Sequence, residues 1–284
     1  MVVGSRRGEM KLRIAALCLS MFLPLSAMAL SGEKLIPPEK FNAMPDVNDY
    51  SSQTEIAATV KSREGVTIRF EGYPPKDDLP IIMFIPGGDW GGHDGLFPVT
   101  RVVFDKMGLG GVLIKPPRSF FKVPAWFRET KEHNQDIDAV IRFLRKKYPN
   151  NQIWISGSSW GATSAANVAT GSTEGVDGVI LFSSVSRELN QAGAGPITKF
   201  PLSKLKVPVL AVHHRKDSCF GTEPHIADEI VRLARNTPVK KAIYFDGGKG
   251  FGDPCKNAHY HGYNGILGEV WTEVGKWVIA NYKR

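Results

Sequence analysis

The chain is poor in cysteine and has no long apolar run beyond residue 29. Only 3 of its 284 residues are cysteine, so a disulfide-built scaffold is excluded and a hydrophobic core must hold the fold. No later segment reaches the roughly 18 apolar residues that a membrane-spanning helix needs. Hydrophobic residues make up 42% and charged residues 23%, which is the balance of a folded globular protein.

The chain also lacks a concentrated basic segment, although its formal net charge is +8. Its Lys and Arg residues are scattered, and the pairs Lys146-Lys147 and Lys240-Lys241 fall where a helix is expected to end and a strand to begin. No basic stripe is interleaved with aromatic residues. Nucleic acid is therefore not expected as a partner.

The first 29 residues have the composition of an export signal. Residues 10–29 begin with Lys11 and Arg13, continue as an apolar stretch and end in an A-x-A cleavage site at Ala29. The apolar stretch is too short for a stable membrane anchor. We predict a cleavable signal peptide over 1–29 and a periplasmic or secreted protein.

Beyond a polar, proline-rich N-terminal arm at 30–53, short β-branched runs alternate with amphipathic stretches. The expected strands are 56–61, 66–72, 81–85, 111–115, 153–156, 179–182, 209–212 and 242–245. The expected helices are 132–148, 162–170, 224–235 and 267–282. Since crossover helices join parallel strands, we predict a single α/β domain over 54–284 with a mostly parallel central sheet flanked by helices. Only Arg187–Lys206 is irregular enough to form a short insertion.

The most informative stretch is a G-x-S-x-G motif between an expected strand and an expected helix. It runs from Gly157 to Gly161, with Ser159 at its centre. Such a turn is so sharp that its central residue is held at strained backbone angles, and glycines let the neighbouring elements approach. Ser158 is the competing serine, but the spacing places Ser159 at the apex. The motif predicts that Ser159 is a nucleophile.

This arrangement resembles the α/β-hydrolase family, and the resemblance covers nearly all of the chain after residue 29. The similarity is to serine hydrolases of the secreted bacterial type with a minimal lid. It implies a Ser-Asp-His order of catalytic residues along the chain and an acyl-enzyme intermediate. We assign no cofactor and no metal.

The family places its acid after a later strand, and Asp217 follows the apolar run that begins at Val209. Asp217 fits the carboxylate that orients the base and supports its imidazolium form. Asp246 and Asp253, beyond the next strand, are the alternatives. His213 and His214 precede the acid, and we expect them to be structural or to line the pocket.

The resemblance places the base just before the last helix, where two histidines occur. His261 is followed by Gly262 and the aromatic Tyr263, as is common in the family. His259 stands two residues earlier on the same loop. We assign His261 as the base and keep His259 as the alternative.

The resemblance also implies two backbone donors for the oxyanion. One is the N–H of Trp160, which follows the nucleophile. The other belongs to the glycine-rich loop after the third expected strand, where Gly88 is our choice. Pro86 stands where many family members have histidine, which is a departure from the family's pattern.

The two cysteines that remain after residue 29 lie near the predicted acid and base. Cys219 follows Asp217 by two residues, and Cys255 precedes His261 by six. Since thiols of exported proteins are commonly oxidised, we predict a Cys219–Cys255 disulfide that ties the acid loop to the base loop. The chain-entropy model gives such a bond roughly 3.8 kcal/mol of stabilisation.

Together these features predict an exported serine hydrolase that cleaves carboxylic esters. A peptidase or amidase could use the same residues. A non-catalytic binding protein with this fold is a third hypothesis. The expected partner is a small-molecule ester or a short peptide. Because the insertion is so short, we expect an open site rather than one under a large mobile cap.

Overall fold

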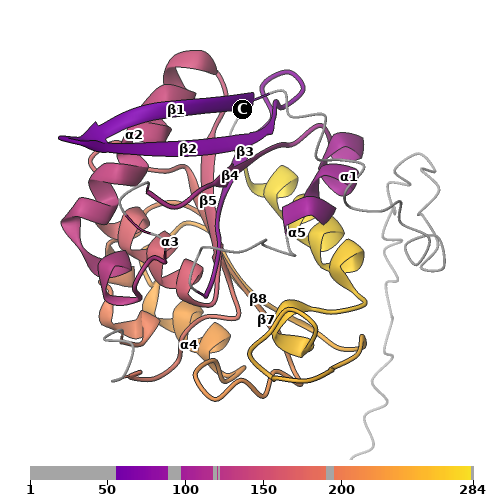
Figure 1. Ribbon diagram of the computed structural model, residues 1–284. Helices are drawn as coiled ribbons and strands as arrows, with labels where there is room; N and C mark the ends of the chain where they lie inside the picture. The colour runs from indigo at the N-terminus through magenta and orange to yellow at the C-terminus, as the bar shows by residue number, and fades with distance from the viewer. Residues whose placement is uncertain (1–55, 89–96, 118–119, 121, 190–194, 283–284) are drawn as a thin grey trace, which may run out of the picture. The chain divides into compact units, whose positions relative to one another are not determined.

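The computed structural model describes residues 56–88, 97–117, 120, 122–189 and 195–282 (Figure 1). The predicted signal peptide and N-terminal arm lie outside these residues. The chain divides into two compact units at residues 36 and 37, and every described residue belongs to the second. No helix in the described ranges is long and apolar enough to cross a membrane.

A sheet of eight strands forms the centre of the described unit. The strands are β1 (Ile56–Arg63), β2 (Val66–Tyr73), β3 (Ile81–Ile85), β4 (Gly110–Ile114), β5 (Ile153–Ser158), β6 (Gly178–Phe182), β7 (Val209–His214) and β8 (Lys240–Phe245). Their spatial order is β1-β2-β4-β3-β5-β6-β7-β8, so β1 and β8 are the outer strands. The β1–β2 and β2–β4 pairs are antiparallel, and every other pair is parallel. The prediction of a mostly parallel sheet is confirmed.

Helices cover both faces of this sheet (Figure 1). The helices are α1 (Phe97–Met107), α2 (Lys131–Lys147), α3 (Trp160–Gly171), α4 (Ile226–Leu233) and α5 (Leu267–Asn281). One core lies between the sheet and α2, α3 and α4, and a second lies between the sheet and α1 and α5. Side chains of β3 pack in both cores, because successive residues of a strand point to opposite faces of the sheet. The first core contains Ile81, Met83 and Ile85, and the second contains Ile82 and Phe84. The result is a three-layer α/β arrangement.

The helix α2 shows how local signals set the boundaries that the sequence predicted. Its N-cap is Thr130, whose hydroxyl accepts a hydrogen bond from the backbone N–H of His133 at 3.1 Å. Basic residues in its last turn complement the helix dipole, and Pro149 follows its C-cap residue. The observed helix begins and ends within one residue of the expected one.

The helix α1 was missed by the sequence analysis. Its β-branched residues, such as Val99 and Val103, have weak helix propensity, and the helix is only 11 residues long. Val99 and Val103 are buried on one face, and Gly108, with φ of +75°, follows the helix end. The four-residue spacing of Val99 and Val103 and the glycine at 108 were the sequence signals that could have predicted α1.

The short insertion expected over Arg187–Lys206 is described except for 190–194. From residue 195 onward it forms the 3₁₀ helices η5 (Ile197–Lys199) and η6 (Leu202–Lys204). Ile197 and Leu202 are almost completely buried and belong to the core on the α3 and α4 side. This part of the insertion is therefore anchored in the fold rather than free to act as a cap.

Candidate active site

Ser159 lies at the sharp turn between β5 and α3. Its backbone has φ of +55° and ψ of −121°. A positive φ is strained for a residue that carries a side chain. The turn is held on both sides, because the Ser159 N–H donates to the Phe182 carbonyl at 3.0 Å and the Ser159 carbonyl accepts from Ala162 N–H at 2.9 Å. Ser158, the competing serine, is the last residue of β5 and is buried. The structure thus places Ser159 at the apex.

The glycines of the motif are required by close backbone contacts. A Cβ on Gly157 would lie 2.0 Å from the Gly161 carbonyl oxygen, and one on Gly161 would lie 2.0 Å from the Ile85 carbonyl oxygen. Any side chain at either position would therefore force β5, α3 and β3 apart. These contacts fix the start of α3, where the Trp160 N–H is one of the amides without an acceptor inside the helix.

A buried carboxylate and a buried imidazole are in direct contact beside the cavity that Ser159 borders. His261 Nδ1 lies 2.9 Å from Asp217 Oδ2, and the side chains are 5% and 0% exposed, respectively. Because Nδ1 faces an acceptor, it carries the hydrogen in the neutral ring, which leaves Nε2 as the basic nitrogen. This is the tautomer that a general base next to a serine needs.

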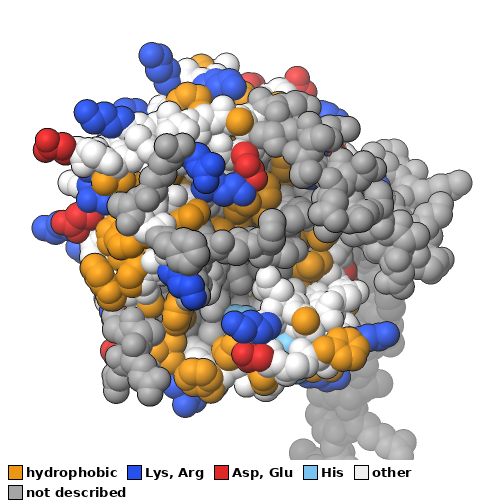
Figure 2. Space-filling model, in the orientation of Figure 1, with side chains coloured by type: hydrophobic (Ala, Val, Ile, Leu, Met, Phe, Trp, Pro, Cys, Tyr) orange, Lys and Arg blue, Asp and Glu red, His pale blue; other side chains and the backbone are white. Residues whose placement is uncertain are grey.

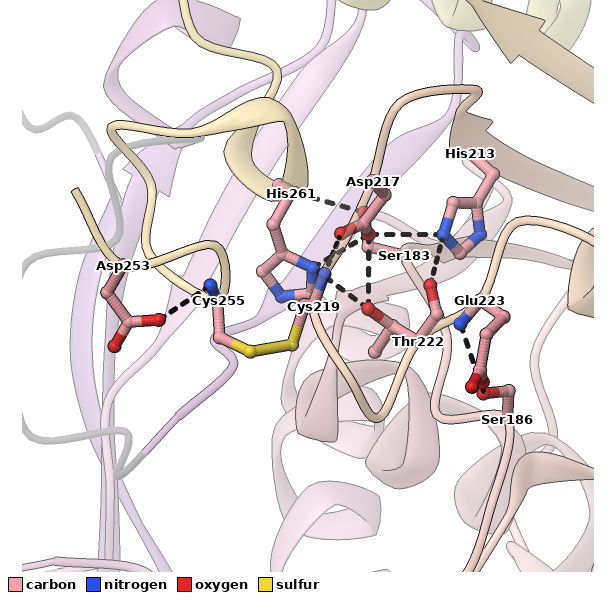
Figure 3. The surroundings of a disulfide bond; sticks show 10 residues. All are labelled: Ser183, Ser186, His213, Asp217, Cys219, Thr222, Glu223, Asp253, Cys255 and His261. Atoms are coloured by element: carbon pink, nitrogen blue, oxygen red, sulfur yellow. Dashed lines mark hydrogen bonds and ion pairs between the residues drawn. A yellow bond between two sulfur atoms is a disulfide. The ribbon is translucent and has the colours of Figure 1, made fainter. Parts of the chain in front are cut away.

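Asp217 receives four hydrogen bonds (Figure 3). In addition to His261, its Oδ2 accepts from the Thr222 hydroxyl and from His213 Nε2, each at 3.1 Å, and its Oδ1 accepts from Cys219 N–H at 3.0 Å. Burial alone would raise the pKa of Asp217, but the bonds from His213 and His261 outweigh it and hold this pKa far below its usual range. Asp217 is therefore ionised at neutral pH.

The residues kept as alternatives for the acid and the base have other partners. Asp246 forms an exposed ion pair with Arg215 at 3.2 Å, and Asp253 accepts a hydrogen bond from the Cys255 backbone N–H at 2.9 Å. The His259 ring packs edge-on against Tyr260. Among these candidates, Asp217 and His261 are the carboxylate and imidazole that the structure brings into contact.

His213 and His214, adjacent on β7, have different surroundings. The ring of His214 stacks on Tyr260, and its Nε2 lies 3.0 Å from the Gly247 carbonyl. His213 instead lies against Asp217, and its Nε2 is also 2.9 Å from the Thr222 carbonyl. Because both neighbours of this nitrogen are acceptors, it must carry a hydrogen. The sequence carries no signal for this second histidine on Asp217.

The predicted disulfide is present in the structure. Cys219 and Cys255 are bonded, with their Cα atoms 4.6 Å apart, and the bond lies beside His261 (Figure 3). It joins the turn after Asp217 to the loop before His261. The Cys219 N–H also donates directly to Asp217, so the bonded residue contacts the carboxylate that the disulfide was expected to hold.

The loop after β3 lies against the nucleophile turn. A Cβ on Gly87 would lie 2.6 Å from the Ser158 carbonyl oxygen and 3.1 Å from Ser159 Cβ. Gly88, the predicted second oxyanion donor, has φ of +51°, which favours glycine. The rest of this loop, from 89 to 93, lies outside the described residues.

Arg128 was not singled out by the sequence analysis, yet it contacts this loop. It belongs to the 3₁₀ helix η3 (Trp126–Glu129) and is fully buried. Its Nη1 donates to the Pro86 carbonyl and its Nη2 to the Gly88 carbonyl, each at 2.8 Å. An arginine before a helix carries no sequence signal that separates it from a surface cation.

A cavity of about 440 Å³ lies between the Ser159 turn, the loop after β3 and the loop that carries His261. Its lining includes the predicted nucleophile, base, disulfide and oxyanion donors: Ser159, His261, Cys219, Cys255, Trp160 and Gly88. Leu189 and the exposed Phe220 add apolar surface, and Lys256 is the charged side chain of the described lining. The described residues hold no cluster of His, Cys, Asp and Glu suited to a metal ion.

Charge is dispersed over the face shown in Figure 2. Lys and Arg side chains there alternate with acidic, apolar and polar ones, and the part of this face that is described carries no continuous basic stripe. The arrangement agrees with the scattered charges of the sequence.

Comparison with known proteins identifies the class of this fold. A family model described as serine aminopeptidase, S33, matches residues 123–223. A dienelactone hydrolase from Anabaena variabilis is similar in structure, with a TM-score of 0.60 and 16% identity over 80% of this chain and 98% of that one. An esterase from Pyrococcus furiosus has a TM-score of 0.60 and 12% identity over 84% and 96% of the two chains. No curated protein sequence matches the chain.

An acylaminoacyl peptidase from Pyrococcus horikoshii has the same fold in part of its chain. Its TM-score is 0.60 at 14% identity, covering 84% of this chain and 43% of that one. The chain is thus an α/β-hydrolase by fold, as predicted. Its similarities are to enzymes of the serine hydrolase type.

Proposed function

We propose that the protein is a serine hydrolase that cleaves carboxylic esters through Ser159, His261 and Asp217. The observation that carries this proposal is the buried 2.9 Å contact between His261 Nδ1 and Asp217 Oδ2, on a cavity that Ser159 also lines. The strained backbone of Ser159 supports its role as the nucleophile.

In the first half-reaction, Ser159 Oγ attacks the ester carbonyl carbon while its proton passes to His261 Nε2. Asp217 stabilises the imidazolium that forms. The carbonyl oxygen becomes an oxyanion and accepts hydrogen bonds from the N–H groups of Trp160 and Gly88. Collapse breaks the bond to the alcohol, which leaves with the proton from His261 and leaves Ser159 acylated.

In the second half-reaction, water takes the place of the alcohol. His261 Nε2 accepts a proton from the water as it attacks the acyl carbon. The tetrahedral intermediate then collapses, the carboxylic acid leaves, and the proton returns to Ser159 Oγ. This cycle needs no group beyond the chain and water.

The test combines substitution with covalent labelling. Ser159→Ala should lower ester turnover by roughly 10⁴-fold or more with little change in the melting temperature, and His261→Ala should be nearly as damaging because the two residues act as one unit. His259→Ala and Ser158→Ala are the matched controls, which should keep turnover. A fluorophosphonate should label Ser159. Labelling of Ser158, or a dead His259→Ala beside an active His261→Ala, would reverse the assignments.

A peptidase or amidase is the second candidate, because the matching family is described as a serine aminopeptidase and one similar structure is an acylaminoacyl peptidase. Esters and amides of one acyl group, assayed side by side, separate the two activities. Faster amide cleavage at equal acyl group would favour the peptidase. A chain that is neither labelled nor active would instead be a binding protein.

We also propose that the protein works outside the cytoplasm. The Cys219–Cys255 disulfide supports this location, since such bonds persist in oxidising compartments. Mass spectrometry of the exported protein should find an N-terminus at Leu30. A retained N-terminal segment would argue against the signal peptide.

A further inference from the structure

Arg128 stands between the two segments that carry the proposed oxyanion donors. On one side its guanidinium bonds the Pro86 and Gly88 carbonyls. These two peptide groups flank the peptide that carries the Gly88 N–H. Because peptide groups are planar, fixing both neighbours limits how that N–H can turn.

On its other side Arg128 is bonded to α3, the helix that begins at Trp160. Its Nη1 lies 3.2 Å from Ser164 Oγ, and its own carbonyl accepts from Asn167 Nδ2 at 3.0 Å. Both partners are buried residues of α3. One side chain and its backbone thus connect the helix of the first donor to the loop of the second.

We propose that Arg128 is a positioning residue that sets the spacing between the Trp160 and Gly88 N–H groups. This inference rests on the proposed function, because it assigns the arginine to the oxyanion site of that reaction. Arg128 does not touch the substrate, and its effect passes through the backbone of residues 86–88.

The chemistry of the guanidinium suits this role. Its planar fork directs several N–H groups at fixed angles, whereas a lysine offers one compact charge and cannot span three acceptors with the same geometry. Burial lowers the pKa of the neighbouring His133 to about 3, and the positive charges of Arg128 and Arg63 act in the same direction. His133 is therefore neutral and does not repel the buried guanidinium.

The decisive readout is the rate ratio between an ester and its thionoester, in which sulfur replaces the carbonyl oxygen. Sulfur is a larger atom and a weaker hydrogen-bond acceptor, so an intact oxyanion site accelerates the ester far more than the thionoester. A change that only loosens the fold slows both substrates alike. A change that misplaces a donor lowers the ratio.

The variants are Arg128→Lys and Arg128→Met, with Phe127→Leu as the matched control. Phe127 is also buried on η3, but its ring packs on Phe120 and His133 and makes no bond to the loop. For Arg128→Lys we expect kcat for the ester to fall about 10²-fold with KM little changed, and the ester-to-thionoester ratio to fall at least about tenfold. Phe127→Leu should lower the melting temperature and keep the ratio.

Ser164→Ala keeps the test decisive if the Arg128 variants fold poorly, because it deletes one oxygen and one contact. It should lower the ratio in the same direction by a smaller factor. An unchanged ratio in Arg128→Lys, or in Ser164→Ala where the Arg128 variants do not fold, overturns the role of Arg128. If the wild-type protein is labelled at Ser159, that result leaves the proposed function intact. Absence of both labelling and turnover in the wild type would instead reject the proposed function itself.

Discussion

The carboxylate of Asp217 is shared between two histidines, and only one of them faces the cavity of Ser159. His261 lines that cavity, whereas His213 is buried on β7 and donates to the same Oδ2 atom. A hydrogen bond to a charged group contributes about 1.5–3 kcal/mol, and more is lost when a buried charge is left without its donor. His213 should therefore help to keep Asp217 ionised.

This role predicts a pH-dependent difference in stability between two variants of His213. His213→Gln keeps an N–H near the position of Nε2, whereas His213→Leu removes it, and neither new side chain titrates. The folded-state pKa of Asp217 is depressed, so its stabilisation is complete above the unfolded pKa of about 4 and is lost as pH falls through the folded value. Loss of the donor makes that depression smaller.

We therefore expect the Gln variant to lose more unfolding free energy than the Leu variant between about pH 4 and pH 2, by about 1–2 kcal/mol. Above about pH 5 the gap between them should be constant. Urea unfolding at a series of pH values measures the unfolding free energy of each variant. Parallel curves across the whole range would mean that His213 does not stabilise the charge of Asp217.

At the scale of elements, the candidate site is assembled by loops at the carboxyl ends of β3, β5 and β7, with the proposed base, His261, on the loop before α5. Loops are the least stable parts of such a fold, and the Cys219–Cys255 bond connects two of them. A shift of the base by about 1 Å can cost on the order of 10²-fold in rate. The bond is thus placed where a small displacement matters most.

The double variant Cys219→Ser with Cys255→Ser should lower turnover more than it lowers secondary structure. Reduction of the wild type should have the same effect, and the double variant treated with reductant is the control, which should not change further. Mass spectrometry of unreduced protein should find the linked peptides. If the double variant turns over at the wild-type rate, the bond serves stability alone.

The sequence predicted most elements because strand, turn and helix signals agreed along the chain. The G-x-S-x-G motif indicated Ser159, and the family resemblance indicated Asp217 and His261. The two cysteines left after residue 29 indicated the disulfide. Arg128 and the contact of His213 could not be found in this way. Both depend on which side chains meet across distant elements, and neither residue type is marked by its neighbours in the sequence.

At the scale of the whole molecule, the described residues form no large cap over the site. The described part of the connection from β6 to β7 contains no α-helix, and from residue 195 it packs into the core. The cavity of about 440 Å³ has the size of pockets that hold small ligands. Substrate should therefore enter without a large conformational change.

We predict that p-nitrophenyl esters with short acyl chains are cleaved faster than those with long chains. For palmitoyl relative to butyryl esters, kcat/KM should fall by about 10-fold or more, since the longer chain leaves apolar surface in water. The rate should also rise smoothly through the solubility limit of the substrate. A jump in rate at that limit would instead reveal a lid that opens at interfaces.

Among the described residues, no further strand pairs with the outer edges of β1 and β8, and this has one more consequence. An unpaired strand edge offers N–H and C=O groups to any extended chain that approaches. Lys61 lies on β1, and Lys240 and Lys241 lie on β8, so both edges carry ammonium groups. A second copy aligned on either edge would bring like charges together. We therefore expect these lysines to oppose growth of the sheet from one molecule to the next, and with it fibre-like aggregation.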